Sequence, residues 1–67
     1  MAGIQISLAA ARVNAGMTQE ELAEKMHLSK HTIVNWEKGR VKPKPAQFEM
    51  YCRICNISTD FVDLERG

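Results

Sequence analysis

The sequence predicts a small all-α domain made of short helices joined by short loops. The chain has 67 residues, of which 45% are hydrophobic, so it can form one modest core and is too apolar for a disordered chain. Apolar residues recur at spacings of three and four, which is the period of a helix. Candidate caps and helix-terminating residues divide the chain at short intervals. We therefore expect a single domain over residues 1–67 with five helices.

The first two expected helices precede residue 27. A second helix should begin at Thr18, because Thr18 and Glu21 have the spacing of a capping box, which satisfies unpaired N–H groups at a helix start. It can continue only to about Met26, since Ser29 is the next strong N-cap. The helix before it should end near Gly16, and its apolar stripe consists of Ile4, Leu8, Ala11 and Ala15.

The third expected helix, from Lys30 to Lys38, has two different faces. Ile33 and Trp36 lie on the same side as Leu28 and should face the core. Gly39 suits the left-handed residue that ends many helices. The opposite face is mostly polar and consists of Lys30, His31, Val34, Asn35 and Lys38.

Two more helices are expected after the proline-containing segment from Gly39 to Pro45. Asn56 should end the fourth helix in a left-handed conformation. Ser58 then caps a last short helix that holds Phe61 and Leu64. The inner face of the fourth helix consists of Phe48, Tyr51, Cys52 and Cys55.

Charge is distributed unevenly along the chain. The formal net charge is only +1, but residues 30–44 carry five cations and one acid, so this segment is about +4 and the rest about −3. A phosphate backbone would attract the first part and repel the second, which would orient the encounter as well as strengthen it. A solvated charged loop is the alternative interpretation.

The segments from Met17 to Ala23 and from Leu28 to Gly39 resemble the phage Cro/repressor family of helix-turn-helix proteins. The similarity continues through Pro45 and the region from Tyr51 to Ser58, so it covers most of residues 8–64. It implies a compact five-helix domain of the lambda-repressor-like type, in which helices two and three form a helix-turn-helix. Such a protein is similar to transcriptional regulators that insert the second of these helices, here 30–38, in the major groove of double-stranded DNA.

The resemblance also implies roles for individual residues. Lysine can donate to guanine, asparagine can pair with adenine, and a valine methyl can touch that of thymine. The predicted base contacts are Lys30, His31, Asn35 and, on the same exposed face, Val34. Gln19 should touch a phosphate and brace the recognition helix, and further phosphate contacts are expected from Lys38, Arg40, Lys42 and Lys44. Arg12 and Glu37 resemble a pair that forms an internal salt bridge in this family.

Two positions depart from the family pattern. His27 stands where the family often has glycine in the turn between helices two and three, and histidine tolerates positive φ with some strain. Asn56 replaces another common glycine, and asparagine is the usual second choice at that kind of cap.

The two cysteines suggest an alternative to DNA binding. Cys52 and Cys55 form a Cys-x-x-Cys, but His27 and His31 lack the spacing of a zinc finger, and no strand precedes the cysteines as in redox proteins. We expect core thiols, no metal and no cofactor.

No catalytic group can be assembled from the polar residues, which argues against an enzyme. A protein-binding module of the same fold, such as an antitoxin or assembly partner, stays open as the alternative.

A domain this small buries too little interface for tight DNA binding alone, so we expect a homodimer on a palindromic operator. The end from Phe61 to Leu64, together with helix four, is the predicted dimer surface. The first residues, Met1 to Ser7, have no secretion signal and no apolar run is long enough for a membrane, which indicates the cytoplasm of a bacterial or phage-infected cell.

Overall fold

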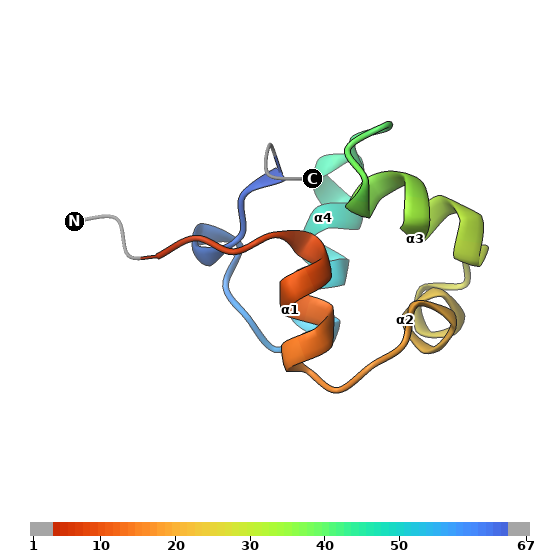
Figure 1. Ribbon diagram of the computed structural model, residues 1–67, viewed down its shortest axis with the longest axis horizontal. Helices are drawn as coiled ribbons and strands as arrows, with labels where there is room; N and C mark the ends of the chain where they lie inside the picture. The colour runs from red at the N-terminus through yellow and green to blue at the C-terminus, as the bar shows by residue number, and fades with distance from the viewer. Residues whose placement is uncertain (1–3, 65–67) are drawn as a thin grey trace.

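Four α-helices and a final 3-10 turn make up the described part of the chain. The computed structural model describes residues 4–64. Its elements are α1 (Leu8–Asn14), α2 (Gln19–Met26), α3 (Lys30–Glu37), α4 (Pro45–Ile54) and the turn η1 (Thr59–Phe61). In Figure 1, α2 and α3 lie together on one side, and the segment before α1 and the turn η1 lie on the other. The all-α class is confirmed.

The core draws on all four helices. Its smallest exposures belong to Leu22, Ile33 and Tyr51, which come from α2, α3 and α4. The centroids of the Trp36 and Tyr51 rings lie 6.5 Å apart, and the ring planes are tilted by 51°. The buried apolar set is Leu8, Ala11, Leu22, Ala23, Ile33, Trp36, Tyr51, Cys52, Cys55 and Val62.

The helix-turn-helix forms largely as its caps predict. The Thr18 hydroxyl accepts from the backbone N–H of Glu21 at 3.1 Å, and the Glu21 carboxylate accepts from the backbone N–H of Thr18 at 2.8 Å. This capping box starts α2 at Gln19. His27 ends the helix in the left-handed region at φ 58°, and the Ser29 hydroxyl caps α3 by accepting from the N–H of Thr32. The predicted third helix is one residue too long, because Lys38 is its C-cap.

The first expected helix begins later than its apolar stripe suggests. Ser7 caps α1 by accepting from the N–H of Ala10 at 3.1 Å, and the helix starts at Leu8. Ile4 therefore lies outside it and is 86% exposed. The expectation that Ile4 belongs to the buried stripe of the first helix was wrong. The backbone before Leu8 does not join the helix, because Ile6 pairs with Val62 instead.

The fifth expected helix is replaced by the single turn η1. Ile6 and Val62 form a parallel β-bridge, in which the N–H of Ile6 donates to the Phe61 carbonyl and the N–H of Asp63 donates to the Ile6 carbonyl, both at 2.8 Å. These groups are no longer available for helical hydrogen bonds. As a result Val62 is buried, whereas its neighbour Phe61 is 47% exposed.

Candidate nucleic-acid interface

One side of α3 is exposed and polar, and the other is anchored in the core. Ile33 and Trp36 are buried, at 0% and 4% exposure. Lys30 and His31 are exposed, and Val34 and Asn35 are half-buried on the outer side. The structure thus brings the four predicted base-contact residues together on one face. A major groove is wide enough to accept a helix in this arrangement.

Lys30 already has a partner on the neighbouring helix. Its Nζ lies 3.2 Å from Oε2 of Glu20, in the first turn of α2. Both side chains are more than half exposed. Contact between Lys30 and a base would therefore form beside a carboxylate, which the sequence pattern did not indicate.

Asn35 is also held by a neighbour. Its Oδ1 accepts from Nη1 of Arg40 at 3.4 Å. The backbone N–H of Arg40 donates to the Asn35 carbonyl at 3.0 Å, because Gly39 at φ 76° turns the chain back over the end of α3. Arg40, expected only at phosphate, therefore also lies against a predicted base-contact residue.

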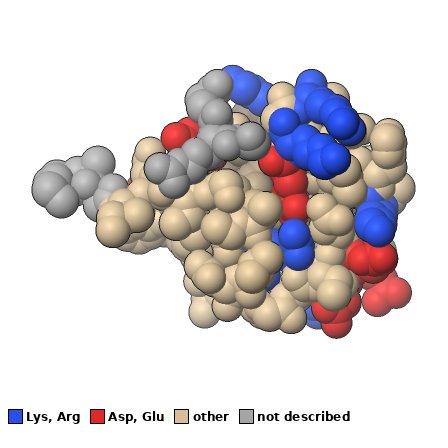
Figure 2. All heavy atoms as spheres, viewed as in Figure 1, with Lys and Arg blue, Asp and Glu red and all other residues tan. Residues whose placement is uncertain are grey.

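The predicted phosphate contacts that follow α3 form a cationic rim. Lys38, Arg40, Lys42 and Lys44 are all exposed. Buried Pro43 holds the segment to the body of the domain. In Figure 2 the blue side chains gather over α3 and the loop after it, and red ones gather lower, toward α2. The cations that follow α3 are therefore gathered in space, whereas Lys30, at the start of α3, lies beside the carboxylate of Glu20.

A buried hydrogen-bond network fixes the end of α3. Nε and Nη2 of Arg12 donate to Oε2 and Oε1 of Glu37 at 2.8 and 3.1 Å. Gln19 donates to Oε1 at 3.0 Å, and the Tyr51 hydroxyl donates to Oε2 at 2.6 Å. Arg12 also donates to the Met17 carbonyl at 2.8 Å. Side chains from all four helices thus meet at the Glu37 carboxylate, and these hydrogen bonds fix α3 against the other three helices.

The network keeps Glu37 ionised although it is buried. Burial acts to raise the pKa of this carboxyl, but the hydrogen bonds from Arg12, Tyr51 and Gln19 together hold it below its ordinary value. Burial, followed by the hydrogen bond to Glu37, raises the pKa of the Tyr51 phenol. The hydrogen bond to Glu37 raises the pKa of the Arg12 guanidinium. Arg12 and Glu37 are therefore both charged at neutral pH.

Arg12 and Gln19 connect α1 and the start of α2 to α3, because both donate to Glu37. The Gln19 side chain is half-buried at the start of α2 and points its amide at Glu37. Of the groups in this network, Tyr51 was missed as a hydrogen-bond donor, because its spacing indicated only a core residue. The signal was present in principle, since a buried tyrosine hydroxyl requires a partner.

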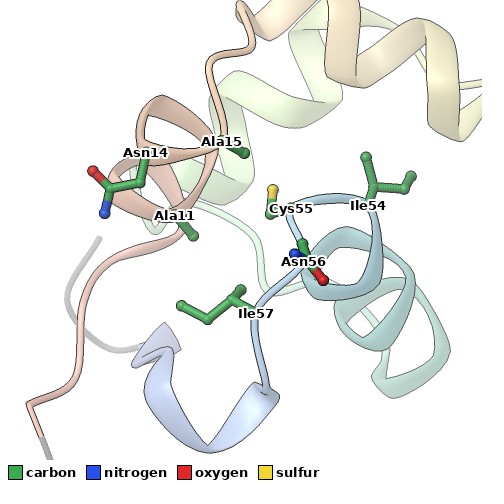
Figure 3. Close-up of a pocket in the computed structure, with 7 residues that line it drawn as sticks. All are labelled: Ala11, Asn14, Ala15, Ile54, Cys55, Asn56 and Ile57. Carbon is green, nitrogen blue, oxygen red and sulfur yellow. The ribbon is translucent and has the colours of Figure 1, made fainter.

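The two cysteines are free and buried. Burial raises the pKa of both thiols to about 11. Cys55 borders a cleft of about 440 Å³ between the end of α1 and the end of α4, and none of the residues that line the cleft comes from α3 (Figure 3). Within residues 4–64, no group of three or more His, Cys, Asp or Glu side chains is placed to hold a metal ion. In the same part of the chain, no helix has the length and apolar character needed to cross a membrane.

Two helices joined by a tight turn, the second with an exposed polar face, define a helix-turn-helix unit. The family model for helix-turn-helix proteins matches residues 8–62. The chain therefore belongs to the helix-turn-helix family, in its Cro/C1-type, lambda-repressor-like branch. Membership implies a DNA-binding regulator of transcription, and a domain of this kind alone is typical of regulators that are not enzymes. No curated protein and no solved structure matches the chain.

Proposed function

We propose that the chain binds double-stranded DNA sequence-specifically as a repressor of phage or prophage type, with α3 in the major groove. The observation that carries the proposal is the outward stripe of Lys30, His31, Val34 and Asn35 on a helix whose other side is fixed in the core. A rigid helix presents donors and a methyl group in a constant arrangement, which is what base recognition requires. The exposed cations after α3 would contact phosphates beside the groove.

A homodimer on a palindromic operator, in the cytoplasm of a bacterial or phage-infected cell, completes the proposal. Half-sites would lie about 34 Å apart, one turn of the duplex. Phe61 supports the predicted dimer surface at η1, because it is a large apolar side chain that is 47% exposed. Burying it between two copies would add to the stability that a 67-residue domain gains from its own core.

Selection of bound sequences from a random duplex library tests the proposal directly. A palindromic consensus is the expected result, and it would support base reading and dimerisation together. Failure to enrich any sequence at low salt would contradict sequence-specific binding and favour the protein-binding alternative.

Two variants then separate the predicted roles. Asn35→Ala should lower the ratio of specific to non-specific affinity by an amount equivalent to roughly 1–3 kcal/mol for each half-site. Lys38→Ala should leave that ratio nearly unchanged and reduce the slope of log affinity against log salt by about 0.9 for each bound protomer. Lys25→Ala is the matched control, because Lys25 is an exposed lysine in the last turn of α2, outside the segment 30–44 and outside the predicted dimer surface. If Lys25→Ala flattens the salt dependence as much as Lys38→Ala, the assigned phosphate contact is wrong.

A further inference from the structure

The carboxylate of Glu20 lies directly against a predicted base-contact residue. Its Oε2 is 3.2 Å from Nζ of Lys30. Glu20 is in the first turn of α2 and Lys30 is the first residue of α3, so the pair spans the turn that joins the two helices. The sequence pattern had not assigned Glu20 a role at the DNA.

The pair is too exposed to act mainly on folding. The two side chains are 53% and 65% exposed, and a pair in that setting contributes little to stability, because water screens it and two long side chains must be ordered. Glu20 is nevertheless ionised at neutral pH, since its own backbone N–H and then the Lys30 ammonium hold the pKa of the carboxyl below its usual value. The ion pair therefore bears on how Lys30 contacts DNA more than on the stability of the fold.

An ammonium has three N–H donors and one positive charge. Glu20 uses one donor and places a negative charge 3.2 Å from the ammonium, which weakens the attraction of Lys30 to a phosphate. The two remaining donors match in number the two acceptors that guanine presents in the major groove, O6 and N7. The phosphates of any duplex repel the neighbouring carboxylate, and only a duplex with guanine at that position offsets this repulsion with a base contact to Lys30.

We propose that Glu20 is a specificity-determining residue, which orients Lys30 for guanine and suppresses the contribution of Lys30 to non-specific DNA binding. The proposal rests on the proposed function. Glu20 acts through Lys30 and is a positioning residue, so its effect belongs to the difference between two duplexes rather than to affinity as such.

The test compares Glu20→Gln with Glu24→Gln. Glu24 is an exposed acid one turn further along α2, and the two variants remove the same charge. Affinity is measured over a range of salt concentrations for the duplex selected from the library and for a scrambled duplex. Thermal unfolding of each variant checks that the fold is kept.

Glu20→Gln should strengthen binding to the scrambled duplex and steepen its salt dependence by up to about 0.9 for each bound protomer, because Lys30 becomes available to a phosphate. The ratio of specific to non-specific affinity should fall by roughly fivefold or more, the lower end of what one good base contact supplies. Glu24→Gln should shift both affinities alike and leave the ratio unchanged. In a Lys30→Gln background, Glu20→Gln should no longer alter the ratio.

Two outcomes overturn the inference, and they are distinguishable. If the wild-type protein selects no duplex, the proposed function fails and this inference fails with it. If the wild type selects a sequence but Glu20→Gln changes the ratio no more than Glu24→Gln, the proposed function stands and the role of Glu20 is rejected.

Discussion

Replacing Arg12 with methionine would remove the cation from the network that fixes α3. The Arg12 and Glu37 side chains are only 13% and 5% exposed. Breaking a buried pair by removing one partner costs about 3–5 kcal/mol, because the other charge stays buried without its counter-ion. Tyr51 and Gln19 would still donate to Glu37, so we expect the lower end, about 3 kcal/mol. A domain of this length has a total stability of roughly 3–10 kcal/mol, so Arg12→Met should remove a large part of it.

Urea unfolding followed by the fluorescence of Trp36 measures this loss, since Trp36 is the one tryptophan and is buried. The thermal midpoint should fall by roughly 12–24 °C. Lys25→Met, at an exposed cation of α2, is the control and should change the free energy of unfolding by less than about 0.5 kcal/mol. Adding Glu37→Gln to Arg12→Met should recover part of the loss, because no unpaired charge then remains. A loss below about 1 kcal/mol for Arg12→Met, the level of an exposed pair, would refute the reasoning.

Two further predictions concern the turn and the thiols. His27→Gly should raise the free energy of unfolding by about 1 kcal/mol in the same urea experiment, because His27 has φ 58° and glycine adopts that conformation without strain; an unchanged or lower value would show that the turn is not strained. Cys52 and Cys55 have native pKa values of about 11 against an ordinary 9.0, so folding favours the protonated thiols and the free energy of unfolding should fall as pH rises from about 9 to 11. The native protein should also react slowly with a thiol reagent at pH 8 and the unfolded protein quickly, whereas equal rates would contradict burial of the thiols.

Local signals predicted most of the fold because each acts within a few residues. Thr18 and Ser29 start helices, and His27, Gly39 and Asn56 adopt the left-handed conformations expected at helix ends. The predictions failed near the termini, where Ile6 pairs with Val62 across the whole domain. No periodicity in the sequence indicates a pairing between residues so far apart. This pairing moved the start of the first helix to Leu8 and left a single turn in place of the fifth helix.

The sequence by itself determined the class of protein and the face of α3 that points outward, because helix period, caps and the family pattern are all written in local residue order. Only the tertiary structure decided which groups meet that face. Glu20 reaches Lys30, and Arg40 reaches Asn35, because the turns after α2 and α3 fold those segments back beside the helix. The direction of a side chain across a turn depends on three-dimensional packing, so residue type and spacing alone could not give it.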